Sequence, residues 1–167
     1  MTTSHSKIPS KKKKVKKEKP IPENIRERAL SAFQKLRRLE CANEDGYVTC
    51  ISCGVVMHWK DAQGGHYIKR QYRATELDPD NVNPQCPRCN NWLDGAQDDY
   101  RWNLRIKIGE ERVLRLERMK HAEMGDEDSM AMLSPEDQIE VLRKKGKVYY
   151  KNRYEEYKAR IKELSNE

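Results

Sequence analysis

The sequence feature that most constrains the fold is a pair of Cys-x-x-Cys motifs. Cys50 and Cys53 form the first motif, and Cys86 and Cys89 form the second after an interval of 32 residues. Each motif places two thiolates on one tight turn, and two such turns complete the tetrahedral sulfur shell that Zn²⁺ prefers in structural sites. The spacing therefore predicts a small domain held together by one zinc ion.

A zinc ion with four cysteine ligands has no open coordination position, so it cannot activate a water molecule itself. We expect the metal to fix the two ends of the interval and the interval to carry the chemistry. The alternatives are disulfides or buried free thiols; disulfides require an oxidising compartment, and the chain shows no secretory signal. The fifth cysteine, Cys41, has no partner at motif spacing and is interpreted as a core or surface thiol.

The positive charge is concentrated at the N-terminus. Residues 1–19 hold eight Lys and one Glu, which equals the net charge of +7 of the whole chain. The lysines include a run of four, Lys11, Lys12, Lys13 and Lys14. Such a segment cannot bury a core, so we expect a disordered arm over residues 1–22 that contacts a polyanion such as nucleic acid. A solubilising or spacer tail is the alternative. The sequence lacks an apolar run long enough to span a membrane, and we expect a soluble protein without a membrane partner.

Hydrophobic spacing predicts an α+β domain over residues 23–120. An amphipathic helix is expected over 23–39, because its apolar residues recur at helical intervals. Two short strands, Tyr47–Thr49 and 55–60, flank the first cysteine turn, and residues 61–65 read as a flexible link. Residues 71–85 lack periodicity and are expected to form a loop. Helices follow from Asn90 to Gly109 and from Glu110 to Met119.

A polar linker is expected over residues 121–133 and a helical extension over 134–167. Ser134 and Pro135 are typical of a helix start. After Gly146, apolar residues alternate at intervals of four and three along one seam, Tyr150, Tyr154, Tyr157, Ile161 and Leu164. We expect this seam to pack against the domain, with dimerisation as the alternative. Trp92 and Trp102 are expected in the core, since a chain with a single Phe needs them for packing.

His66 is the candidate catalytic residue of the interval. It follows two glycines and precedes Lys69 and Arg70. A neutral imidazole can take a proton from a water that attacks a phosphodiester, and Mg²⁺ or Mn²⁺ with oxygen ligands would neutralise the developing charge. Asn90, next to Cys89, is a candidate ligand through its amide oxygen, and Asn81 is expected to brace the loop or orient the imidazole.

These residues resemble a known family. Cys50-Ile51-Ser52-Cys53-Gly54, Gly65-His66-Tyr67, Gln85-Cys86 and Cys89-Asn90 are similar to the NinG (Rap) family of bacteriophage recombination endonucleases, which are zinc-containing HNH (ββα-metal) enzymes. The resemblance covers about residues 25–120. It implies a ββα-metal core, a metal-dependent nuclease that cuts branched DNA such as Holliday junctions, and work in the cytoplasm of a bacterial host.

By position, the resemblance makes His66 the general base, Asn81 the middle asparagine and Asn90 the metal ligand. Many HNH enzymes carry Asp directly before the histidine, whereas Gly65 stands here, as in the NinG family. A carboxylate ligand must then come from elsewhere, and Asp61 and Asp78 are the candidates. Three cations after the histidine are expected to contact DNA phosphates, Lys69, Arg70 and Arg73.

Two other functions fit the sequence. A zinc-ribbon protein that binds DNA without cutting it, as an accessory in recombination or transcription, would tolerate the loss of His66. A protein-interaction module would use the tyrosine seam of the last helix. Junction resolution favours two active sites facing two strands, so a homodimer is a further expectation.

Overall fold

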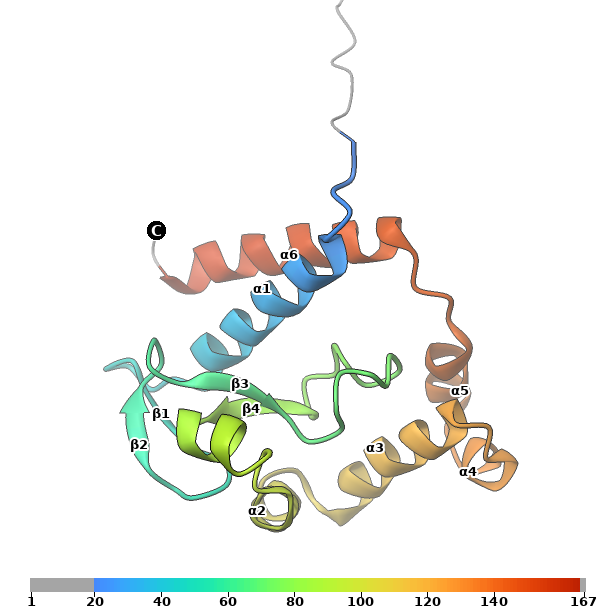
Figure 1. Ribbon diagram of the computed structural model, residues 1–167, viewed down its shortest axis with the longest axis horizontal. Helices are drawn as coiled ribbons and strands as arrows, with labels where there is room; N and C mark the ends of the chain where they lie inside the picture. The colour runs from blue at the N-terminus through green and yellow to red at the C-terminus, as the bar shows by residue number, and fades with distance from the viewer. Residues whose placement is uncertain (1–19, 166–167) are drawn as a thin grey trace, which may run out of the picture.

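The computed structural model describes residues 20–165 and has a mixed α+β fold, mostly helical, with two small sheets (Figure 1). The predicted lysine run, Lys11 to Lys14, and most of the predicted disordered arm lie outside the described residues. Within 20–165, no helix is both long and apolar enough to cross a bilayer. In chain order the elements are α1 (Ile25–Glu40), β1 (Tyr47–Thr49), β2 (Val56–His58), β3 (Gln63–His66), β4 (Val82–Gln85), the π-helix η1 (Arg88–Trp92), α2 (Gln97–Ile108), α3 (Glu110–Glu123), α4 (Glu127–Ala131), α5 (Pro135–Leu142) and α6 (Lys147–Ser165).

The fold contains two antiparallel strand pairs, each joined by a loop. The first pair encloses the first cysteine turn, and the second pair encloses the loop that follows His66. β1 pairs with β2 as expected, and β3 pairs with β4, with Gly65 opposite Asn83 and His66 opposite Val82. The predicted flexible link at 61–65 and the predicted loop at 71–85 were therefore wrong in part. Both strands contain residues that disfavour strands, two glycines in β3 and Pro84 in β4, so neither shows a periodic signal.

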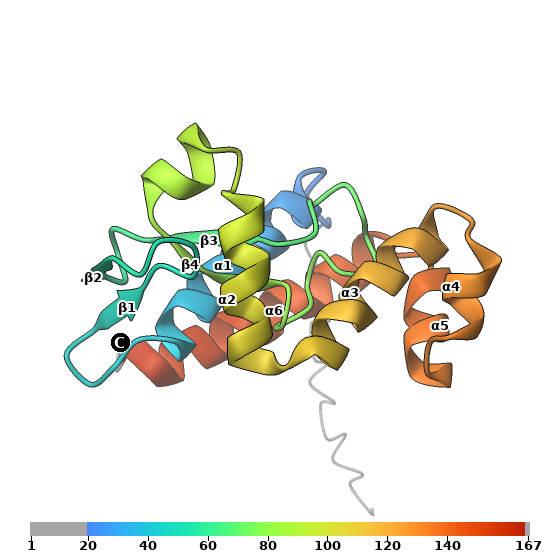
Figure 2. The ribbon, with the colours of Figure 1, turned by 90° about the horizontal axis from the view of Figure 1, so that it is seen from below.

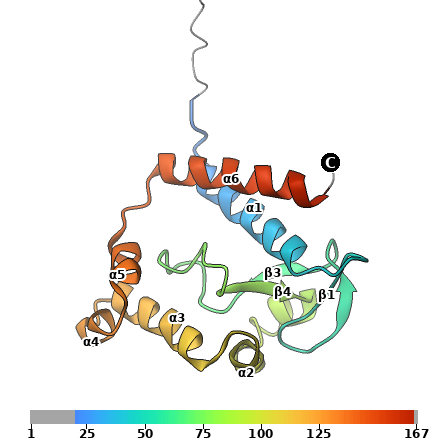
Figure 3. The ribbon, with the colours of Figure 1, turned by 180° about the vertical axis from the view of Figure 1, so that it is seen from behind.

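Helices α1 and α6, far apart in the sequence, pack together on one side of the β3–β4 pair, while α2 covers the other side (Figures 1 and 3). Tyr157 of α6 packs with Phe33 and Leu36 of α1, and its ring centroid is 5.0 Å from that of Phe33. Tyr150 is buried against Ile25 and Ala29. The tyrosine seam thus packs on the domain, which confirms the expected packing, while dimerisation stays a prediction.

The region from α3 to α5 differs from its prediction. Residues 121–133 were expected to be a polar linker, but they contain the end of α3 and the whole of α4. Ala122 and Leu133 are buried with Met119 against Ala74. Charged residues between these apolar positions conceal the pattern in the sequence. The predicted cap of α5 is confirmed, because the Ser134 hydroxyl accepts a hydrogen bond from the backbone N–H of Asp137.

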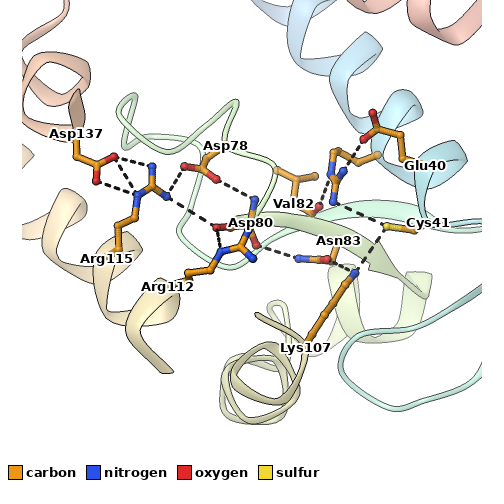
Figure 4. Close-up of polar contacts among 11 residues, drawn as sticks. Glu40, Cys41, Asp78, Asp80, Val82, Asn83, Lys107, Arg112, Arg115 and Asp137 are labelled. Atoms are coloured by element: carbon orange, nitrogen blue, oxygen red, sulfur yellow. Dashed lines mark hydrogen bonds and ion pairs between the residues drawn. The ribbon is translucent and has the colours of Figure 1, made fainter. Parts of the chain in front are cut away.

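Arg115 of α3 joins three segments. Its guanidinium contacts the carboxylate of Asp137 in α5 at 2.7 Å and that of Asp78 in the loop before β4 at 2.8 Å (Figure 4). Arg112, one turn earlier, pairs with Asp80. These ion pairs tie the loop between β3 and β4 to α3 and α5.

The prediction that two tryptophans belong to the core was wrong. Trp92 is 84% exposed and Trp102 is 58% exposed. The core instead uses tyrosine and aliphatic residues: Tyr100 and Leu104 of α2 are fully buried with Val113 and Leu116 of α3. The Tyr100 hydroxyl donates to the Gly65 carbonyl at 3.0 Å, which lets the ring be buried without an unpaired polar atom.

Candidate metal centre and adjoining polar cavity

The four motif cysteines converge on one point. Their sulfur atoms all lie within 4.8 Å of one another, and the Sγ atoms of Cys53 and Cys86 are 3.8 Å apart. Tetrahedral Zn²⁺ with Zn–S bonds of about 2.3 Å places its sulfurs about 3.8 Å apart. The thiolate donor set and the spacing therefore fit a metal ion such as zinc, held by Cys50, Cys53, Cys86 and Cys89.

Local backbone hydrogen bonds build both cysteine turns. In the first turn, Gly54 adopts a positive φ of 75° and its N–H donates to the Cys50 carbonyl at 3.0 Å. In the second turn, the Cys89 N–H donates to the Cys86 sulfur at 3.4 Å. The Cys86 N–H in turn donates to the Cys50 sulfur at 3.3 Å, which links the two turns. N–H groups directed at sulfur favour the thiolate form that a metal requires.

A polar cavity of about 640 Å³ lies beside the cluster. It brings together four of the predicted site residues, His66, Lys69, Arg70 and Asn90. β3 supplies the histidine, the following turn supplies the two cations, and η1 supplies the asparagine. Asn90 directly follows Cys89, so the second cysteine motif fixes one part of the cavity lining.

His66 is held mainly by one contact. Its Nε2 lies 3.0 Å from the backbone carbonyl oxygen of Glu76. A carbonyl can only accept, so Nε2 carries a proton and the lone pair of the neutral ring is on Nδ1. Burial lowers the pKa of His66 from 6.5 to about 4, helped by the charge of Arg70 and opposed by the carbonyls of Glu76 and Gly64. The ring is therefore neutral at pH 7, with its proton on Nε2.

The Glu76 carbonyl is itself held in place through the Glu76 side chain. That carboxylate is fully buried, receives bonds from Arg26 of α1 at 2.6 and 3.0 Å, and accepts from the Tyr150 hydroxyl of α6 at 2.5 Å. A buried carboxylate needs such partners. Through this residue the α1–α6 pair positions the loop that orients His66.

Asn81 and Asn90 differ in what they contact. Asn81 is fully buried: its amide accepts from the Ile68 N–H at 2.6 Å and donates to the carbonyls of Ile68 and Thr75 at 3.0 and 2.9 Å. Asn81 therefore braces the loop, which is one of the two roles expected for it. It does not line the cavity, so this geometry does not support the catalytic assignment that the family resemblance gave it. Asn90 donates its Nδ2 to Gln63 at 2.5 Å, and its Oδ1 is the atom that a cation would take.

Close packing explains the glycines before His66. A Cβ added to Gly65 would lie 2.1 Å from Oε1 of the buried Gln85, and a Cβ on Gly64 would lie 2.7 Å from Cβ of Gln34 in α1. Both contacts are shorter than a side chain tolerates. An aspartate directly before the histidine, as in many HNH enzymes, does not fit this backbone.

The remaining candidates lie in different places. Asp78 pairs with Arg115 and is not brought to His66, so the proposal that it binds a catalytic cation has no geometric support. Asp61 is exposed and adjoins Ala62, a lining residue, while Arg73 does not line the cavity. Asp94, which sequence reasoning missed, does line it and pairs with Lys69 at 3.0 Å. The signal was the Asp94-Gly95 turn five residues after Cys89.

The fold and site define a class: a small α+β protein in which a cluster of four cysteines that can hold a metal ion adjoins a basic cavity containing a neutral histidine. The chain belongs to the NinG family, because residues 2–167 match the family described as Bacteriophage Lambda NinG protein. The family part of the sequence resemblance is thereby confirmed. Neither the curated proteins nor the solved structures contain a match to the chain.

Proposed function

We propose that this protein is a metal-dependent DNA endonuclease that acts on branched recombination intermediates such as Holliday junctions. The observation that carries the proposal is the geometry of His66: a neutral imidazole with its Nε2–H on the Glu76 carbonyl and an unprotonated Nδ1, in a cavity that three cations and an amide oxygen line. The preference for branched DNA rests on the family resemblance.

In the proposed reaction, a phosphodiester of the DNA enters the cavity and its charge is balanced by Lys69 and Arg70. His66 Nδ1 takes a proton from a water molecule as the water oxygen bonds to phosphorus. The bond from phosphorus to one ester oxygen breaks, and that oxygen takes a proton from solvent. A Mg²⁺ or Mn²⁺ ion would stabilise the charge on phosphorus-bound oxygens. Asn90 with Asp94, or Asp61 at the rim, would hold this ion.

One observation favours a second function, DNA binding without cleavage. The backbone excludes the aspartate that many HNH enzymes carry before the histidine. In this alternative the cysteine cluster and the basic cavity only present a DNA-binding surface.

The two functions are separated by incubating the protein with a synthetic four-way junction and a linear duplex of matched sequence. Mg²⁺ or Mn²⁺ is added to the wild type, to His66→Ala and to His58→Ala, whose histidine lies in β2 outside the cavity. The nuclease proposal expects metal-dependent cutting of the junction by the wild type and His58→Ala but not by His66→Ala. Binding without cutting in all three proteins would contradict it and favour the accessory function.

A further inference from the structure

The most exposed large apolar side chain among the described residues stands next to the cavity. Trp92 is 84% exposed, and the following residue, Leu93, is 49% exposed. They continue the chain directly from Asn90 and Asn91, which line the cavity, so at most about 7 Å of backbone separates Trp92 from Asn90. Figure 2 shows the segment of η1 and the turn after it, in light green, standing out from the β3–β4 pair at the edge of the molecule.

The turn that carries Trp92 is firmly anchored. Cys89 is buried in the metal cluster, and the Leu93 N–H donates to the Arg88 carbonyl at 3.1 Å. The Gly95 N–H donates to the Cys89 carbonyl at 2.9 Å, and the Gly95 carbonyl accepts from the buried Gln85 amide at 2.5 Å. The backbone that carries the exposed indole is therefore already ordered, which lowers the entropy lost when the side chain binds a partner.

The surroundings of Trp92 favour a nucleobase as that partner. Three exposed cations lie near Trp92. Arg88 is four residues earlier in the chain, and Lys69 and Arg70 line the adjoining cavity. A stable protein interface needs about 800 Å² from each partner, whereas one tryptophan buries about 150–250 Å². A single aromatic ring among cations suits the stacking of one base, and aromatic side chains stack on every base type.

Base stacking also distinguishes branched DNA from duplex DNA. Within a continuous duplex, both faces of each base are covered by its neighbours, and a protein side chain must separate them to insert. At an open branch point the continuous stack is interrupted where the arms meet. We propose that Trp92, backed by Leu93, stacks on the base exposed at the branch point beside the phosphodiester in the cavity, and thereby selects branched substrates. This inference rests on the proposed function for the placement of the phosphodiester.

The test measures binding, so it does not depend on cleavage. In a His66→Ala background, Trp92→Ala is compared with Trp102→Ala as a control. Trp102 lies on α2, and the Arg105 guanidinium carbon sits 4.3 Å from the centroid of its ring, so one face of that ring already has a partner. Trp92→Ala is expected to weaken junction binding about 5- to 150-fold, the ~1–3 kcal/mol of one stacked base, and to leave duplex affinity within about twofold. Trp102→Ala is expected to change neither. A second measurement uses Trp59→Phe/Trp102→Phe protein, in which quenching of Trp92 emission by the junction and not by the duplex is expected.

Equal losses on junction and duplex, or unchanged emission on a bound junction, would overturn the inference. So would the absence of any DNA binding, or a dimer that Trp92→Ala dissociates. Junction-selective quenching by a protein that cuts nothing would contradict the nuclease proposal and leave the stacking inference standing.

A separate observation concerns a groove of about 750 Å³ between α1 and α6. Its lining has a single carboxylate, Glu27, and five cations, Arg28, Lys35, Arg38, Lys158 and Lys162. Arg38 also lines the His66 cavity, so the two depressions share a wall. Lys35, Lys158 and Lys162 form no ion pair with any carboxylate in residues 20–165. Because the chain outside residues 1–19 has no net charge, this concentration of cations is a local feature.

We infer that this groove binds the phosphate backbone of one duplex arm and leads it to the cavity. The inference rests on the proposed DNA substrate but not on cleavage. Lys158→Ala/Lys162→Ala is expected to reduce the slope of log affinity against log salt by about 1.8, since each phosphate contact in duplex DNA contributes about 0.9. Arg143→Ala/Lys144→Ala removes the same charge outside the groove and is expected to leave the slope unchanged. Equal slopes for the two double variants would refute the groove as a DNA-binding surface.

Discussion

Replacing Gly65 with alanine tests how tightly the strand that carries His66 is packed. The new methyl group would lie 2.1 Å from Oε1 and 2.9 Å from Cδ of Gln85. Gln85 cannot move freely, because its Nε2 donates to the Ser52 hydroxyl at 2.8 Å and to the Gly95 carbonyl at 2.5 Å. Overpacking of a buried site costs about 1–3 kcal/mol, and each lost hydrogen bond about 1 kcal/mol. We therefore expect the free energy of unfolding to fall by about 3 kcal/mol.

Urea denaturation and thermal melting of zinc-loaded protein measure this change. A loss of about 3 kcal/mol corresponds to a fall in Tm of roughly 6–12 °C for a chain of this size. Gly146→Ala is the matched control, because an added Cβ there meets no atom within 4 Å, and we expect a change below about 1 kcal/mol. Combining Gly65→Ala with Gln85→Ala should cost less than the two single losses added together. A stability for Gly65→Ala equal to that of the control would refute the packing argument.

Three further predictions concern the support of the site. Tyr150→Phe should lower the free energy of unfolding, measured by urea denaturation, by about 1.5–3 kcal/mol, because it removes the hydrogen bond to the buried Glu76 carboxylate. Tyr154→Phe removes only an exposed hydrogen bond with Arg28 and should change it by less than about 1 kcal/mol. Zinc analysis should find one ion per chain, lost in Cys89→Ser and kept in Cys41→Ser; equal zinc in both variants would contradict the cluster. In an NMR titration the His66 ring should stay neutral from pH 8 down to about pH 5.5, since its pKa of about 4 lies below 6.5, and titration near 6.5 would contradict the burial argument.

Much of the frame could be predicted because it depends on local signals. The spacing of the cysteine motifs predicted the cluster, helical spacing predicted α1 and α6, and the Ser134-Pro135 capping signal predicted α5. The β3–β4 pair could not be predicted in the same way. Its strands are four residues each and contain glycines and a proline, and they form only because residues distant in the sequence pair with each other and pack against Gln34 and Tyr100.

In the candidate site, too, the residues marked by local motifs could be predicted and those that depend on distant contacts could not. Motif spacing identified His66 and Asn90, which the fold does bring to one cavity. It did not identify Glu76, Asp94 or the exposure of Trp92. Glu76 acts through a backbone carbonyl and a buried ion pair with Arg26, and neither leaves a mark in the sequence. A tryptophan in a chain with a small core is more often buried, so its exposure becomes visible only in three dimensions.

The proposed nuclease depends on His66 as the proton acceptor in phosphodiester hydrolysis. The most direct test is the single-turnover rate of junction cleavage by His66→Ala with and without added imidazole. The proposed function predicts that the variant loses about 10²- to 10⁴-fold in rate and that imidazole restores part of it, because the small base can occupy the space left by the side chain. A variant as fast as the wild type, or one whose lost activity imidazole does not restore while zinc content and junction binding are unchanged, would contradict the role assigned to His66.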